Sequence, residues 1–236
     1  LIIKFISIYS TNFDLFGDEA QYWLWSKNLD FGYFSKPPLL PGIIALVCSV
    51  FGNSFFVIKM ISVLVYCVSS YVVFLISKKL YKNSDLALLT ATSFFLMPAV
   101  SVSSFLISTD VVLILFWSLA LLQTLIIKEK PSFLNFILLG VFVGLAFMAK
   151  YAAIYFILSM MFLLLEKTMR DVFFKNKLFS ICFILTFMLI IAPNILWNIN
   201  YGWITFEHTA DNAALDRLNL HFVESLKFIG SQIAMV

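Results

Sequence analysis

Charged residues are scarce in this chain: Asp, Glu, Lys and Arg make up 12% of its 236 residues, about half the share that is usual in a soluble domain. Hydrophobic residues make up 62%. A soluble protein of this size could not bury so much apolar surface, which excludes a soluble enzyme and a nucleic-acid-binding module. The apolar stretches are long and continuous, so they predict transmembrane helices and not the alternating strands of a barrel.

Several signatures of cofactor chemistry are also missing. The three cysteines, Cys48, Cys67 and Cys182, lie in apolar stretches without CxxC spacing, which is typical of buried free thiols. There is no glycine pattern of the Rossmann or P-loop kind, so nothing indicates a nucleotide. His208 has no Cys nearby, and a single His is weak evidence for a metal. We therefore expect neither a metal site nor another cofactor.

The apolar segments predict an all-α fold, a polytopic transmembrane helical bundle. They lie at residues 1–10, 39–52, 53–77, 86–107, 111–127, 133–149, 151–165, 178–199 and 226–236. The segment 39–52 is too short to cross a bilayer and follows two prolines, so it is expected to lie at the membrane interface. No internal repeat or linker is apparent. We expect a single membrane domain, residues 1–236, that is part of a longer protein continuing at both ends.

Three short connections hold most of the basic residues, and two spans separate each from the next. They contain Lys78, Lys79 and Lys82; Lys128 and Lys130; and Lys167, Arg170, Lys175 and Lys177. The positive-inside rule places all three in the cytoplasm. The other connections then face the extracytoplasmic side. They carry Lys36, His208 and nine of the 13 acidic residues: Asp14, Asp18, Glu19, Asp30, Asp110, Glu207, Asp211, Asp216 and Glu224.

The first outer loop contains an acidic pair, Asp18-Glu19, followed by the aromatic residues Tyr22, Trp23 and Trp25. Aromatic rings prefer the headgroup level of a membrane. A carboxylate at that depth is partly desolvated, which raises its pKa and suits a general base. The alternative is a solvated helix start, where acids interact favourably with the helix dipole.

Three more positions on this face suit the chemistry of a phosphate or a proton. Lys36 precedes two prolines that fix the backbone, so its ammonium is held in one direction. The lysine either binds a lipid phosphate or extends its ammonium to the membrane interface as a snorkelling side chain. Asp110 opens the span 111–127, either as a helix cap or as an acid facing the same cavity as Asp18. Lys150, before Tyr151, either marks an outer turn or adds positive charge for a phosphate.

Two runs in the first outer loop carry a family resemblance: GDEAQYWLWS at residues 17–26 and GYFSKPPL at residues 32–39. Further pieces follow in the family's order, STD at 108–110, GLAFMAKY at 144–151, and PN at 193–194 through WN at 197–198 to GW at 202–203. The chain resembles glycosyltransferase family 39, which includes the dolichyl-phosphate-mannose protein mannosyltransferases. Bacterial relatives include the aminoarabinose transferase of lipid A.

This resemblance implies a membrane glycosyltransferase of the GT-C type, with interfacial helices in the first extracytoplasmic loop. It would move a sugar from a polyprenyl-phosphate carrier to a hydroxyl of a lipid, glycan or protein acceptor. The reaction would take place on the extracytoplasmic side of a bacterial inner or plasma membrane, so membrane lipids are expected partners and nucleic acids are not.

The resemblance also implies roles for individual residues. Asp18 would be the catalytic base, Glu19 would support it, and Asp110 would be a second acid in the cavity. Lys36 would hold the carrier phosphate, with Lys150 near it. The full set of candidate substrate-binding residues is Lys36, Lys150, Tyr22, Tyr151 and His208.

One position departs from part of the family pattern. Relatives that act on lipid A tend to have an acid just before the lysine, whereas this chain has Ser35. The departure weakens both a metal site carried over from them and lipid A as the acceptor.

Two other classes of function stay open at this stage. A transporter or flippase of a lipid-linked precursor would need charges near mid-span, for which Lys59 is the one deep candidate. A structural subunit would use the same motifs as caps and anchors.

Overall fold

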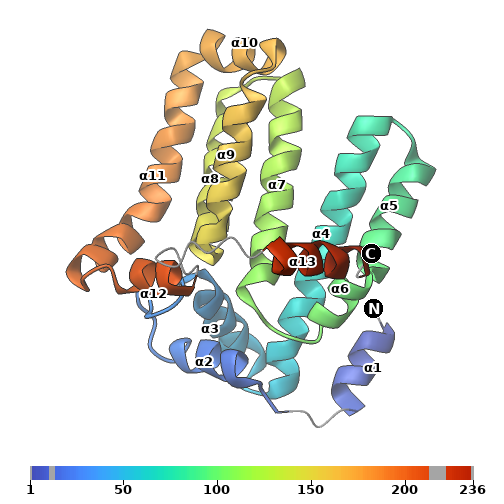
Figure 1. The fold of residues 1–236 in the computed structure, drawn as a ribbon, viewed down its shortest axis with the longest axis vertical. Helices are drawn as coiled ribbons and strands as arrows, with labels where there is room; N and C mark the ends of the chain where they lie inside the picture. Colours follow the sequence, from blue (N-terminus) through green and yellow to red (C-terminus); the bar gives the residue numbers. More distant parts are fainter. Residues whose placement is uncertain (1, 11–13, 213–221, 235–236) are drawn as a thin grey trace.

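The computed structural model describes residues 2–10, 14–212 and 222–234, and these form helices and no strands (Figure 1). The helices are α1 (Ile2–Ser10), α2 (Gly17–Trp25), α3 (Leu39–Phe51), α4 (Phe55–Tyr81), α5 (Ser84–Leu96), α6 (Pro98–Ser103), α7 (Thr109–Glu129), α8 (Phe133–Ala149), the 3-10 turn η1 (Tyr151–Ala153), α9 (Ile154–Leu163), α10 (Lys167–Lys175), α11 (Lys177–Asn200), α12 (Ile204–Asn212) and α13 (Phe222–Ala234). The predicted all-α membrane bundle is confirmed.

Three of the described helices, α4, α7 and α11, are long and apolar enough to cross a membrane. A fourth crossing results if η1 and α9 are counted together with α10, which is bent from them by 99°. The helices α3, α5 and α8 are apolar but shorter. The chain is an integral membrane protein. Of the nine acidic residues assigned to the outer side, Asp216 lies outside the described residues.

The predicted span over residues 86–107 is wrong as a single helix. The chain breaks at Met97, whose backbone is extended, so that α5 ends at Leu96 and α6 starts at Pro98. Proline has no N–H to continue the helix and disfavours helical backbone in the residue before it. The short α6 is followed by a loop, residues 104–108, that leads into α7.

The ends of the bundle separate the basic connections from the candidate site. In Figure 1, the α4–α5 and α7–α8 connections and α10 lie at the upper end, whereas α2, α3 and α12 lie at the lower end. This arrangement agrees with the alternation of basic and acidic connections along the chain. The assignment of the upper end to the cytoplasm stays a prediction.

Close helix packing in the middle of the bundle depends on two glycines four residues apart. α8 packs against both α7 and α11. A Cβ at Gly140 would lie 2.7 Å from the carbonyl oxygen of Phe183 on α11, and one at Gly144 would lie 2.9 Å from the side chain of Ile190. Small residues at this spacing let the backbones of membrane helices approach one another.

We predict that Gly140→Ala lowers the thermal stability of the detergent-solubilised protein, because its methyl group must push α8 away from α11. Overpacking of this kind costs about 1–3 kcal/mol. Gly42→Ala is the matched control, since Gly42 also lies in an apolar helix but has open space where the methyl group would be. Thermal unfolding followed by circular dichroism compares the two, and equal midpoints would contradict the packing argument.

Candidate functional site

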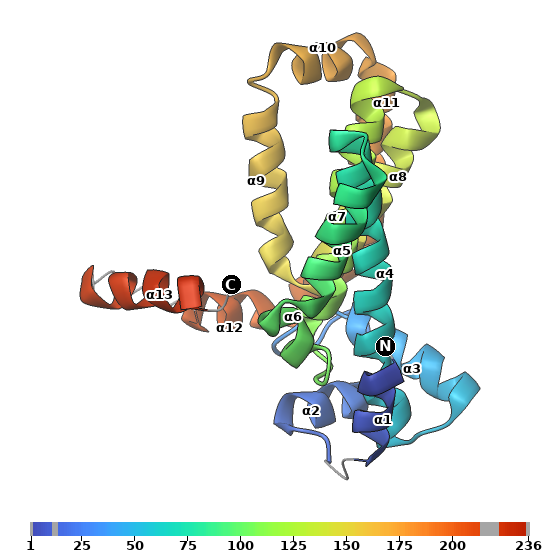
Figure 2. The same ribbon diagram turned by 90° about the vertical axis from the view of Figure 1, so that its right-hand side faces the viewer.

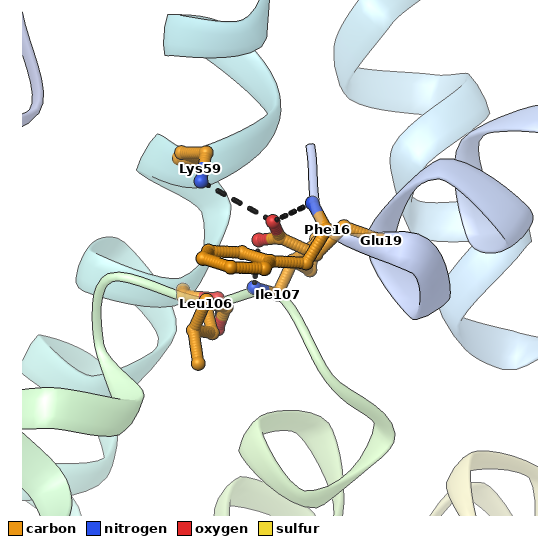
Figure 3. Close-up of polar contacts among 6 residues, drawn as sticks. Phe16, Glu19, Lys59, Leu106 and Ile107 are labelled. Carbon is orange, nitrogen blue, oxygen red and sulfur yellow. Dashed lines mark hydrogen bonds and ion pairs between the residues drawn. The ribbon is translucent and has the colours of Figure 1, made fainter. Parts of the chain in front are cut away.

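The start of α2 is fixed by a buried carboxylate, that of Glu19, which is 2% exposed. It accepts hydrogen bonds from the backbone N–H groups of Phe16 (2.9 Å) and Ile107 (2.8 Å). It also forms an ion pair with Lys59 of α4, at 3.2 Å. Figure 3 shows the carboxylate lying among these three nitrogens. Glu19 is therefore directed into the protein, and the geometry favours the supporting role over direct contact with substrate.

The loop before α7 and the last residue of α6, Ser103, receive three further hydrogen bonds from side chains of α1 and α4. They run from Lys4 Nζ to Ser104 Oγ (2.7 Å), from Ser62 Oγ to the Leu106 carbonyl (2.7 Å) and from the Tyr66 hydroxyl to Ser103 Oγ (2.9 Å). Together with Glu19, these contacts fix the loop from several sides. The loop leads directly to Asp110, so they also set where the first turn of α7 lies.

The two acids proposed from the sequence for the cavity, Asp18 and Asp110, both lie near the side chain of Tyr22. Burial raises the pKa of Tyr22 to about 12, and the Asp18 and Asp110 carboxylates add to the increase. A hydrogen bond with the Thr109 side chain acts in the opposite direction. The phenol therefore keeps its proton at neutral pH and links the start of α2 to the start of α7.

Asp110 also contacts the end of α8. Its Oδ1 atom lies 2.7 Å from Nζ of Lys150, and both side chains are partly exposed. Asp18 is exposed. The structure thus brings carboxylates and an ammonium from three helices to the same end of the bundle.

A cavity of about 530 Å³ opens beside this cluster. Among the described residues, the charged ones that line it are Lys36 and Lys150, and none that lines it carries a carboxylate. The rest of the wall comes largely from apolar and aromatic residues, including Phe147, Ile154 and Phe206. Lys150 is paired with Asp110, whereas Lys36 is in no ion pair found among the described residues. Two ammonium groups in a mostly apolar wall, one of them unpaired, suit an anion that carries an apolar group.

The loop that carries Lys36 is held by polar side chains from the last turns of α11 and from α12. The amide of Asn194 donates to the carbonyl of Phe31 (2.7 Å), and the hydroxyl of Thr205 donates to the carbonyl of Tyr33 (2.7 Å). Gly32 packs so closely on Trp197 that a Cβ there would lie 2.4 Å from the indole ring. The PN and WN motifs contain Asn194 and Trp197, but the sequence did not predict that these residues and Thr205 hold the loop before Lys36.

The remaining sequence-predicted residues divide between the cavity and its surroundings. Tyr151 lines the cavity, stacks on Phe206 at 4.4 Å between ring centroids, and donates a hydrogen bond to Asn194 (2.8 Å). His208 is not among the residues that line it; its ring lies edge-on to Phe34, and its Nδ1 atom is 3.0 Å from the Asn212 amide. Among the described residues, no three His, Cys, Asp or Glu side chains come together as metal ligands would.

Comparison with known proteins gives the family of this chain. The family model for dolichyl-phosphate-mannose-protein mannosyltransferase matches residues 35–197. The chain belongs to that family. The resemblance seen in the sequence motifs is therefore confirmed, and the matched region contains Lys36, Asp110 and Lys150.

A curated relative extends the similarity toward both ends of the chain. The lipid A galacturonosyltransferase RgtD of Rhizobium johnstonii is 30% identical over 224 residues, which cover 94% of this chain and 46% of the relative. The chain thus spans about half the length of that relative. No solved structure matches the chain.

We predict that Glu19 and Lys59 stabilise the fold as a coupled pair. Glu19→Gln and Lys59→Met should each cost about 3–5 kcal/mol, because each leaves a buried charge without its counter-ion. The double variant should lose clearly less than the sum of the two single losses. Denaturant unfolding in detergent measures all three. Losses that simply add would show that the pair is not coupled.

Proposed function

We propose that this chain forms the donor-binding and catalytic part of a membrane glycosyltransferase. It would move a sugar from a polyprenyl-phosphate carrier to an acceptor hydroxyl on the extracytoplasmic face. The observation that carries the proposal is the cavity with its two lysines and, among the described residues, no carboxylate in its wall. It lies beside the Asp18–Asp110 cluster in a chain of the mannosyltransferase family.

The donor's phosphate is placed between Lys36 and Lys150 in this proposal. A lysine binds phosphate as a compact point charge, and that charge acts more strongly where apolar walls exclude water. The apolar side chains of Phe147 and Ile154 would contact the prenyl chain. The positive charge comes from the protein itself, so the proposal includes no metal and no nucleotide.

Transfer proceeds by displacement at the anomeric carbon. The acceptor's oxygen forms a bond to that carbon, and the bond from the carbon to the phosphate oxygen breaks. Asp18 takes the proton of the attacking hydroxyl, and the departing phosphate keeps the electron pair. A positioned proton acceptor typically contributes about 10²–10⁴ in rate. Lys36 and Lys150 stabilise the charge that develops on the phosphate.

Asp110 acts in this scheme through Lys150. The 2.7 Å ion pair holds the lysine ammonium at the edge of the cavity, so that it is in place before donor binds. Side chains held by such partners do not have to be ordered during binding, which lowers its entropic cost. Glu19 has an analogous role for Asp18, because it fixes the first turn of α2.

The acceptor and the sugar are the least constrained parts of the proposal. The relative's name specifies lipid A and galacturonic acid, whereas Ser35 weakens lipid A as the acceptor. We give the relative greater weight, because its similarity extends over 94% of the chain and Ser35 is a single position. A lipid acceptor of the lipid A kind is therefore the first to test.

Nothing in the structure favours a flippase, since the one deep charged candidate, Lys59, is accounted for by its pairing with Glu19.

We predict that Asp18→Asn abolishes transfer in membranes that contain the full-length protein. The amide cannot accept the hydroxyl proton, so the rate should fall about 10²–10⁴-fold at equal protein level. Transfer of label from radiolabelled polyprenyl-phosphate sugars to endogenous lipid measures the rate. Asp14→Asn is the matched control, since Asp14 is an exposed acid in the same outer segment and should keep its activity. A fully active Asp18→Asn variant would overturn the base assignment.

We further predict that Lys36→Met and Lys150→Met weaken donor binding. A hydrogen bond to a charged group contributes about 1.5–3 kcal/mol, so each variant should raise the donor KM roughly tenfold to a hundredfold. Lys27→Met is the control, because Lys27 lies in the same outer segment but does not line the cavity. Unchanged donor KM in both cavity variants would place the phosphate elsewhere.

A further inference from the structure

The end of the bundle opposite the candidate site is covered by α10, which lies across the ends of the longer helices (Figures 1 and 2). α10 makes an angle of 99° with α9. Its inner face is apolar: Met169 is 1% exposed, and the ring of Phe173 lies 5.1 Å from that of Phe136 on α8. Its outer face carries the exposed side chains of Lys167, Arg170 and Lys175. Apolar packing thus holds a charged surface at this end.

The positive charge of this surface is only partly compensated. The α7–α8 connection and the segment around α10 together contain three acids, and each of them is already paired with a lysine. The pairs are Glu129 with Lys79 (2.6 Å), Glu166 with Lys128 (2.7 Å) and Asp171 with Lys175 (3.2 Å). Four basic side chains of the α7–α8 connection and the segment around α10 are outside the ion pairs found among the described residues: Lys130, Lys167, Arg170 and Lys177.

A pocket of about 420 Å³ lies on this surface. It is lined by the ammonium-bearing Lys167 and Lys175, together with Thr168, Asn176 and the paired acid Asp171. Ammonium and hydroxyl groups can donate to phosphate oxygens, whereas the amide and the carboxylate can accept from the hydroxyls of a headgroup. The pocket therefore suits a polar group that combines a phosphate with hydroxyl groups.

Exposed apolar side chains stand beside the pocket in the sequence and extend the surface toward the membrane. Phe174 is 62% exposed, Leu178 is 65% exposed, and Leu165 is 75% exposed. A soluble anion has no apolar part that would contact these side chains, whereas the acyl chains of a phospholipid would contact them. The surface thus matches both halves of a lipid molecule.

We propose that the α10 pocket binds the headgroup of an anionic phospholipid from the leaflet at this end of the bundle. Basic clusters where spans end are attracted to anionic lipids, and the attraction amounts to about fivefold in affinity for each basic side chain near the surface. The site is separate from the sugar-transfer site, so it stands independently of the proposed glycosyltransferase activity.

The test uses the purified full-length protein in a neutral detergent. Dioctanoyl-phosphatidylglycerol is added in steps, and the thermal midpoint together with the lipid retained in native mass spectrometry reports binding. Dioctanoyl-phosphatidylcholine and inorganic phosphate are added in parallel. We expect phosphatidylglycerol alone to bind and to raise the midpoint. An equal effect of inorganic phosphate would overturn the proposal in favour of a soluble anion, and equal binding of phosphatidylcholine would show that the charge is not recognised.

Variants then locate the site. Lys167→Gln/Lys175→Gln removes the two ammonium groups that line the pocket. It should weaken phosphatidylglycerol binding by about fivefold or more, and the charge-conserving Lys167→Arg/Lys175→Arg should restore most of it. Lys78→Gln/Lys82→Gln is the matched control, since it removes the same charge at the same end but away from the pocket. Equal losses in the two Gln double variants would overturn the pocket, because the effect would then come from the general surface charge.

Discussion

The buried carboxylate of Glu19 joins three segments that are far apart in the sequence: the start of α2, the first turns of α4 and the loop before α7. Successive residues in a helix point about 100° apart, so turning Glu19 into the protein leaves its neighbour Asp18 directed outward. The same carboxylate holds the loop that precedes Asp110. One buried group thereby places both acids of the cavity end, and its full complement of donors offsets the cost of burying its charge.

Uncharged polar groups play the corresponding part for the loop that carries Lys36. Asn194 and Thr205 bind main-chain carbonyls of the loop before Lys36, and they engage its backbone without neutralising the lysine. Buried amides and hydroxyls thus fix the scaffold, whereas the charges are left at the cavity, where they can meet a ligand. This division explains how the loop is fixed while Lys36 stays outside every ion pair found among the described residues.

Long apolar stretches and the distribution of basic residues were enough to predict the bundle and the grouping of its connections. They could not predict where a proline breaks a helix: Pro98 separates α5 from α6, whereas Pro193 lies within the continuous α11. That Lys36 and Lys150 belong to one candidate site was predictable from their motifs, whereas their role there stays a prediction. The Glu19–Lys59 pair was not predictable, because the partner of a buried charge depends on how two helices are placed relative to one another. The position of His208 was not predictable either, because it depends on how α12 packs: its ring lies against Phe34 and does not line the cavity.

The two lysines of the cavity wall, to which no described residue contributes a carboxylate, have a consequence for turnover. In the proposed reaction, the donor is a phosphodiester with a single negative charge, whereas the carrier that is left behind is a monoester with a charge of about −1.5 to −2. Lys36 and Lys150 therefore attract the spent carrier more strongly than the loaded one. The lysines that help the glycosidic bond to break also delay the departure of the carrier, which makes product release the expected slow step and the spent carrier an inhibitor.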